Sequence, residues 1–175
     1  PRGAKQGGSS AASDGYKGQS VPYLPRGPVS NLVLFRQALG DGFYMQYFQQ
    51  PGVADAEMDA DPRLTMRRIL YTLSGTALRE SGEPPRLIVP EGGSFVDILR
   101  EPPSLPVGDW LTEEDLDIYE ADFQRTGFTG GINYVRSVDM SWELMGAWQN
   151  APVLPPALYI TGDLDLTQGF PGMQE

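Results

Sequence analysis

Two stretches near the end of the chain decide how its fold is to be interpreted. The first is RTGFTGGINYVRSVDMSWELMGAW (125–148). It predicts a helix from about Gly131 to Ala147, with glycines at its start. Its apolar residues recur at helical spacing, at Ile132, Val135, Val138, Trp142 and Met145. The second, ALYITGDLDLTQGF (157–170), predicts a short buried strand and an aspartate-rich turn. A single strand cannot form a sheet, so the pattern indicates a helical insertion within a larger α/β protein.

Helices are also predicted upstream of these stretches. Residues 30–40 carry a serine N-cap and a terminal glycine, and residues 53–75 form two helices broken near Asp61–Pro62. The strongest helix prediction is LTEEDLDIYEADFQRTG (111–127), in which Thr112 and Asp115 form a capping box. The segment Thr76–Asp109, with its Gly and Pro clusters, is expected to be a loop.

The composition excludes several classes of function. The 175 residues carry a net charge of −10, so a nucleic acid is an unfavourable partner. Cysteine and histidine are both absent, which removes disulfides, a thiolate nucleophile, cysteine-bound zinc and the commonest general base. The longest apolar runs fall short of the roughly 18 residues of a membrane span. With no signal peptide recognised, a cytoplasmic location is expected.

No cofactor and no metal are expected either. The cluster GDLDLTQGF invites comparison with a calcium loop, which requires glycine at its sixth position and glutamate at its twelfth. Counted from Asp163, those positions hold Gln168 and Gln174. The aspartates therefore have two open interpretations. They bond local backbone amides in a turn, or one of them is an acid at the carboxyl end of an α/β strand, where active sites collect.

Two tyrosines are candidates for acid chemistry. Tyr44 lies in GFYMQYFQQPG and Tyr134 in GGINYVRS. A buried tyrosine usually fills space and forms one hydrogen bond. A phenol with a pKa near 10 is also suited to donate to an oxygen that is becoming an alkoxide. The residues themselves leave both interpretations open.

The motifs together resemble a known family. From Ser20 onward, SVPYLPRGP, GDGFYMQYFQQPGVADAEMDADPR, WLTEEDLDIYEADFQRTGFTGGINYVRSVDMSWELMGAW and PALYITGDLDLTQGFPG resemble an epoxide hydrolase of the α/β-hydrolase fold, of the soluble bacterial and plant type. The resemblance implies a mainly α-helical cap, or lid, and a short core β-strand near the C-terminus, within a parent fold that is α/β. The implied domains are a disordered tail (1–19), a core-to-cap connection (20–28), a helical cap (29–150) and a core strand with a relay-acid loop (151–175).

The resemblance also implies a mechanism. In that family a core aspartate attacks the epoxide and forms an ester, and a histidine oriented by an acid activates the water that hydrolyses it. Two cap tyrosines polarise the epoxide oxygen. Tyr44 matches the first of them and Asp165 matches the orienting acid. Val135 occupies the second tyrosine position, with Tyr134 one residue earlier and about 100° away around the helix.

Further expectations follow from the same resemblance. Phe43, Phe48, Val135 and Trp142 are expected to contact a small apolar epoxide in a detoxification reaction, and the cap is expected to form a homodimer. The family's nucleophile and histidine have no counterpart here, so the chain alone is expected to be catalytically incomplete. Two alternatives stay open: a non-catalytic helical lid or binding module, and the cap of a related α/β-hydrolase such as a haloalkane dehalogenase.

Overall fold

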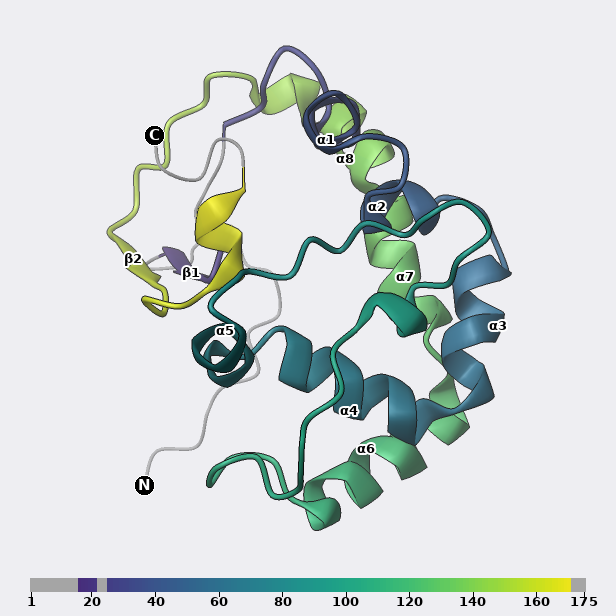
Figure 1. Cartoon of the computed structure of the whole chain (residues 1–175). Coiled ribbons are helices and arrows are strands. Elements are labelled where there is room, and N and C mark those ends of the chain that lie inside the picture. Colours follow the sequence, from purple (N-terminus) through teal and green to yellow (C-terminus); the bar gives the residue numbers. More distant parts are fainter. Residues whose placement is uncertain (1–15, 22–24, 171–175) are drawn as a thin grey trace.

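The protein is mainly helical, as predicted. This computed structural model describes residues 16–21 and 25–170, with the backbone alone for residues 16–19. The elements, in chain order, are β1 (Tyr16–Gln19), α1 (Asn31–Leu39), α2 (Tyr44–Tyr47), α3 (Val53–Ala60), α4 (Pro62–Thr72), α5 (Gly75–Ser81), η1 (Val96–Ile98), α6 (Glu113–Thr126), α7 (Thr129–Arg136), α8 (Val138–Leu144), η2 (Met145–Trp148), β2 (Ala157–Ile160) and η3 (Leu166–Gly169). Figure 1 places the two strands on one side of the molecule and α3 on the opposite side. None of the helices described is long and apolar enough to cross a membrane.

The two strands form a parallel pair. Their register runs from Tyr16 opposite Ala157 to Gln19 opposite Ile160. Two expectations are therefore wrong: the predicted strand does have a partner, and residues 16–19 of the predicted disordered tail form that partner. The rest of that tail, residues 1–15, lies outside the described residues. Because parallel strands need a crossover connection, the whole helical region serves as one, and both strands end at the same edge of the sheet (Figure 1).

Side-chain and proline signals set the helix ends that the sequence predicted. The Oγ of Ser30 accepts the Val33 amide at the start of α1. Thr112 and Asp115 exchange hydrogen bonds in the predicted capping box of α6. Asp61 caps α4 with Pro62 in its first turn, which explains the break between α3 and α4.

Two segments differ from their prediction. The expected loop 76–109 contains most of α5, whose start is capped by Ser74 through the Ala77 amide at 3.2 Å, and the short η1. The single helix expected over 131–147 is divided into α7, α8 and η2. The division falls at Ser137, whose hydroxyl donates to the carbonyl oxygen of Tyr134 at 2.9 Å. Such a bond competes with the backbone pairing of a continuous helix.

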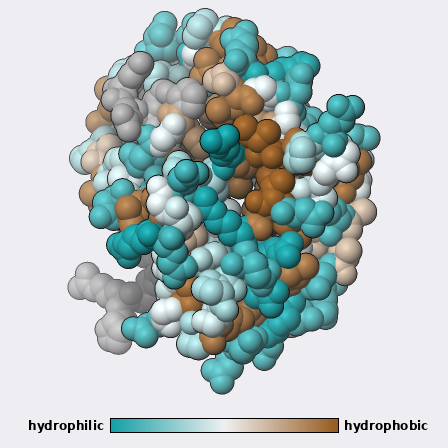
Figure 2. All heavy atoms as spheres, in the orientation of Figure 1, coloured by the Kyte–Doolittle hydropathy of each residue, from teal (hydrophilic) through white to brown (hydrophobic). Residues whose placement is uncertain are grey.

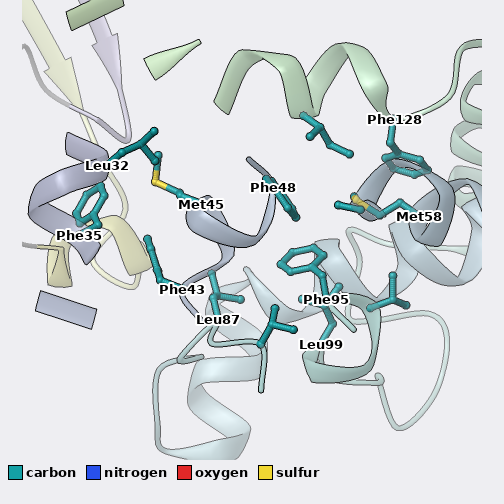
Figure 3. Packing of buried hydrophobic residues seen from close by; sticks show 14 of the residues in the cluster. Leu32, Phe35, Phe43, Met45, Phe48, Met58, Leu87, Phe95, Leu99 and Phe128 are labelled. Atoms are coloured by element: carbon teal, nitrogen blue, oxygen red, sulfur yellow. The ribbon is translucent and has the colours of Figure 1, made fainter. Parts of the chain in front are cut away.

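The main core is rich in aromatic side chains and surrounds α2. Phe43 and Phe48, which flank this helix, are 1% and 6% exposed. Phe48 packs edge-on against Phe95, with ring centroids 4.8 Å apart (Figure 3). The loop after β2 reaches the same core, since Phe170 contacts Phe35 at 5.7 Å and Phe43 at 6.0 Å between ring centroids. The strand region is thus attached to the helical region by apolar packing.

Candidate active site

Helix α2 holds Tyr44 in a fixed position. The Tyr44 amide donates to the carbonyl oxygen of Leu87 at 2.9 Å, and Phe43 forms an antiparallel bridge with Ile88. The side chain of Gln46 donates to the carbonyl oxygen of Leu32 at 2.7 Å. A helix of four residues has little stability of its own. These outside contacts therefore determine where the Tyr44 phenol lies.

The Tyr44 side chain packs among aromatic rings, and its hydroxyl is available for hydrogen bonding. Its ring stands edge-on to Phe43 at 4.7 Å and to Phe48 at 5.4 Å between centroids. Burial raises the pKa of Tyr44 above its usual value. Within the described part of the chain, its hydroxyl has no hydrogen-bonding partner. The phenol is therefore protonated at neutral pH and free to donate to a bound molecule.

Tyr44 lines a cavity of about 170 Å³ with apolar walls. The other lining residues are Ile69, Leu73, Leu87, Phe95, Leu99, Leu166, Thr167 and Phe170. Figure 2 shows hydrophobic residues gathered between α2 and α4 on the face turned to the viewer, with hydrophilic residues around them. A phenol at the wall of an apolar cavity is suited to hold one polar atom of an otherwise apolar ligand.

Asp165 lies after β2 and is held as an anion. Its Oδ1 accepts the amide of Thr167 at 2.9 Å and the hydroxyl of Thr167 at 2.7 Å, and its Oδ2 accepts the hydroxyl of Ser20 at 2.6 Å. Partial burial would raise the pKa of Asp165, but the hydrogen bonds from Ser20 and Thr167 outweigh it and hold the pKa below the usual range. Asp165 bonds a local amide and follows the end of a strand. A catalytic role for Asp165 stays a prediction.

A second cavity, of about 440 Å³, lies beside Asp165. Ser20 and Arg79 also line it. Leu73, Leu166 and Thr167 line this cavity and the Tyr44 cavity alike. The structure thus brings Tyr44 and Asp165 to neighbouring cavities with a common wall, although the two residues lie far apart in the sequence.

Tyr134 lies elsewhere. Its side chain is 81% exposed and lines a separate cavity of about 210 Å³ with Arg26 and Trp142. The next residue, Val135, packs against the main core, to which Tyr44 also belongs. Position 135 rather than position 134 therefore faces the side of Tyr44. A catalytic role for Tyr134 stays a prediction.

The residues expected to contact a substrate divide in the same way. Phe43, Phe48 and Val135 pack in or against the core around Tyr44. Trp142 instead donates from Nε1 to the carbonyl oxygen of Gly27 at 3.0 Å, and the Arg26 guanidinium lies 3.7 Å from its ring centroid. The structure places Trp142 with Tyr134, in the cavity that Tyr44 does not line.

An ion pair that the sequence did not predict fixes α7 against α3. The Arg136 guanidinium binds both carboxylate oxygens of Asp55, and it donates from Nε to the carbonyl oxygen of Phe48 at 2.7 Å. Both side chains are largely buried, at 15% and 11% exposed. The hydrogen bonds from Arg136 hold the pKa of Asp55 well below its usual range, against the opposing effect of burial. No local signal pairs an acid in α3 with a base that lies 81 residues later at the end of α7.

Within residues 16–21 and 25–170, no group of three or more carboxylates is arranged to hold a metal ion. The two neighbouring cavities are lined by the Tyr44 phenol, the carboxylates of Asp163 and Asp165, the Arg79 guanidinium and apolar side chains. Ser20 is the further site residue that sequence analysis missed.

Comparison with known proteins identifies the relatives of the chain, although no family model matches it. It is 43% identical over 157 residues to epoxide hydrolase 1 of Siraitia grosvenorii, which covers 89% of the chain and 46% of that protein. It is 41% identical over 147 residues to epoxide hydrolase A of Mycobacterium tuberculosis, with 83% of the chain and 44% of that protein covered.

Solved structures agree with this relationship. The crystal structure of epoxide hydrolase A from Mycobacterium thermoresistibile superposes with a TM-score of 0.77 at 43% identity, over 90% of this chain and 48% of that one. An epoxide hydrolase from an endophytic Streptomyces gives a TM-score of 0.79 at 39% identity, over 89% and 46% of the two chains. The chain spans about half the length of the curated relatives it matches. It is therefore homologous, over about half of their length, to epoxide hydrolases of the α/β-hydrolase fold.

Proposed function

We propose that this chain contributes the general acid Tyr44 and the orienting acid Asp165 to the hydrolysis of an epoxide to a vicinal diol. One observation carries the proposal. The Tyr44 phenol, which has a raised pKa and no hydrogen-bonding partner among the described residues, lines an apolar cavity that shares a wall with the cavity beside an ionised carboxylate. That the chain is 43% identical to an epoxide hydrolase makes ring opening the reaction to test.

In the first step, the Tyr44 hydroxyl donates a hydrogen bond to the epoxide oxygen. A carboxylate nucleophile attacks one ring carbon, the C–O bond breaks, and its electron pair goes to the oxygen, which takes the phenolic proton. The result is an ester between nucleophile and substrate. The resemblance implies that this nucleophile is a core aspartate, and in our proposal Tyr44 acts as the acid alone.

In the second step, water hydrolyses that ester and releases the diol. The water requires a general base, and the chain contains no histidine. Asp165 acts in this step by orienting the imidazole that supplies the base and by stabilising the imidazolium that forms, as the acid of a catalytic triad does. Its hydrogen bonds from Ser20 and Thr167 keep it ionised for that purpose.

The substrate is a small, mainly apolar epoxide. The cavity of about 170 Å³ offers hydroxyl groups from Tyr44 and Thr167, and its other walls are apolar. Val135 carries no hydroxyl where the resemblance places a second phenol. Tyr44 therefore donates to the epoxide oxygen without a second tyrosine beside it.

A chimera tests this proposal. Residues 1–175 replace the matching half of the Siraitia grosvenorii enzyme, and single-turnover kinetics with styrene oxide separate ester formation from ester hydrolysis. Tyr44→Phe should slow ester formation about 10²–10⁴-fold, the usual contribution of general acid catalysis. The ring is retained, so ester hydrolysis should change little.

Matched variants on α7 serve as controls. Tyr134→Phe should be almost silent, because Tyr134 lines another cavity, and Val135→Tyr should raise the rate of ester formation. Unchanged ester formation in Tyr44→Phe would remove Tyr44 from the mechanism. The chain alone should release no diol above the uncatalysed rate, since it has no histidine to serve as the base. Turnover of styrene oxide by the chain alone at enzymatic rates would contradict the proposal that the base comes from outside this chain.

A further inference from the structure

Ser20 links the ends of the two strands. It directly follows β1, and its amide donates to the carbonyl oxygen of Ile160, the last residue of β2, at 3.0 Å. Ser20 has a φ of 66°, a left-handed conformation that residues with a Cβ seldom adopt. Its carbonyl oxygen accepts from the hydroxyl of Tyr159 at 2.9 Å. An unfavourable backbone conformation persists only where the surrounding contacts fix it, and functional sites are where such residues collect.

The side chain of Ser20 faces Asp165. A hydroxyl has one proton to donate, and the 2.6 Å distance from the Ser20 Oγ to the Asp165 Oδ2 is typical of a hydroxyl bound to a carboxylate anion. The two residues are 145 positions apart in the chain. They meet because parallel strands bring their carboxyl ends to one edge of the sheet.

These bonds limit how the Asp165 carboxylate can turn. A carboxylate has about four acceptor positions on its two oxygens. The amide and hydroxyl of Thr167 occupy Oδ1, and the hydroxyl of Ser20 occupies one position on Oδ2. The side chain of Thr161 also lies close enough to lower the pKa of Asp165. With both oxygens bound, rotation about the Cβ–Cγ bond would break the hydrogen bonds from Ser20 and Thr167. The remaining position on Oδ2 is therefore held in one direction.

We propose that Ser20 is a positioning residue for Asp165, which fixes the carboxylate so that Oδ2 accepts the N–H of the catalytic imidazole. Ser20 and Asp165 line the same cavity of about 440 Å³, which is where that imidazole enters. The inference rests on the proposed function, because it assigns Ser20 a part in the ester-hydrolysis step. It adds Ser20, which directly follows β1 and precedes the helical insertion in the sequence, whereas Asp165 comes after that insertion.

The contact itself is tested on the full chain by following the Asp165 carboxyl carbon in a ¹³C NMR titration. Loss of one hydrogen bond to the charged form should raise the pKa of Asp165 by about one unit in Ser20→Ala. Ser20→Gly, which also lacks the hydroxyl but accepts the left-handed backbone, should give the same shift. Ser104→Ala, at an exposed loop position, should give none. An unmoved Asp165 pKa in Ser20→Ala would overturn the proposal.

The role is tested in the chimera described above. Ser20→Ala should slow hydrolysis of the ester about tenfold, equivalent to the loss of one such hydrogen bond, and should leave ester formation unchanged. Because the acid stabilises the imidazolium, the acidic limb of the pH profile for ester hydrolysis should also move. An active chimera in which Ser20→Ala hydrolyses the ester at the parent rate would refute the positioning role. A parent chimera without any activity would instead count against the proposed function, and the titration would decide the Ser20–Asp165 contact separately.

Discussion

The helical region (29–150) and the strand region (16–21 with 151–170) are stabilised by different forces. The helical region encloses two apolar clusters, in which Phe43 and Leu116 are almost inaccessible to solvent. In β2, by contrast, every residue is exposed, including Leu158 at 51% and Ile160 at 54%. Backbone pairing and the hydrogen bonds around Ser20 and Asp165 hold the strand region. Parallel strands are normally buried on both faces, so the apolar side chains of β2 suit a strand inside a larger α/β sheet.

The proposed catalytic groups come from both regions. Tyr44 belongs to the helical region and Asp165 to the strand region, so their relative position depends on how the two regions pack. Leu166 and Phe170 carry that packing, because both reach from the loop after β2 to the core around α2. The difference between the regions therefore bears on the proposed function: the firmly packed helical region supplies Tyr44, and the less buried strand region must hold Asp165 at a fixed position relative to it.

The largest effect should come from the helical core. Phe43→Ala removes a ring that is 1% exposed and should lower the free energy of unfolding by about 3–5 kcal/mol. Leu158→Ala in β2 should cost less than about 1 kcal/mol, since half of that side chain is already in water. Urea unfolding of the full chain measures both. Equal losses at the two positions would show that β2 is buried as deeply as the helical core.

The buried ion pair should have the next largest effect. Asp55→Asn leaves the Arg136 charge largely buried without its counter-ion and should cost about 3 kcal/mol. The exposed pair Arg36–Asp41 is the matched control, and Asp41→Asn should cost less than about 0.5 kcal/mol. Because Arg136 also holds the end of α2, Asp55→Asn should slow ester formation in the chimera. A loss no greater than that of Asp41→Asn would mean that the pair does not hold α7 against α3.

The contrast between the regions also explains what the sequence could predict. Helix ends depend on neighbours within four residues. The sequence therefore predicted the Ser30 N-cap, the helix break at Asp61–Pro62 and the Thr112–Asp115 capping box. The strand Tyr16–Gln19 was not, because YKGQ has no apolar alternation and pairs only with residues far along the chain. The helix at Gly75–Ser81 was missed, although Ser74 is a recognisable cap.

The candidate site divides along the same line. Tyr44 and Asp165 were candidates because short motifs surround them. The sequence showed that Tyr134 lies one residue before the expected tyrosine position, a difference of about 100° around a helix. In the structure, Val135 packs against the main core and Tyr134 lines a separate cavity. The Arg136–Asp55 pair and the Ser20–Asp165 contact join residues that are 81 and 145 positions apart. No periodicity or local motif reports contacts of that range.

Acid should weaken the ion pair gradually. The pKa of Asp55 in the folded protein lies below the value of about 3.9 expected in the unfolded chain, so protons bind the unfolded chain more readily. The contribution of Asp55 is therefore complete above pH 5 and declines as the pH falls through 4, by at most about 1.4 kcal/mol per pH unit. The difference in unfolding free energy between the parent chain and Asp55→Asn should shrink between pH 5 and pH 3. A difference that stays constant over this range would contradict the assigned direction of the pKa.

The smallest expected effect on stability lies where the two regions meet. A Cβ on Gly75, at the start of α5, would lie 3.0 Å from Cδ1 and 3.2 Å from Cβ of Leu164, the residue before Asp165. Leu164 is half-buried and can move by a few tenths of an ångström, while alanine favours the helix over glycine by up to about 1 kcal/mol. Gly75→Ala should therefore change the unfolding free energy by less than about 1 kcal/mol.

Gly75→Ala should nevertheless displace the Asp165 loop, because the contact pushes directly on its neighbour. The amide NMR signals of Asp165 and Thr167 should shift, and the chimera should hydrolyse its ester more slowly with ester formation little changed. Gly130→Ala in α7 is the matched control, since a Cβ there meets nothing within 4 Å, and it should leave those signals in place. If Gly75→Ala moves the Asp165 signals no more than Gly130→Ala does, α5 does not set the position of the acid. The packing of Leu166 and Phe170 on the core around α2 would then hold the strand region in register with Tyr44.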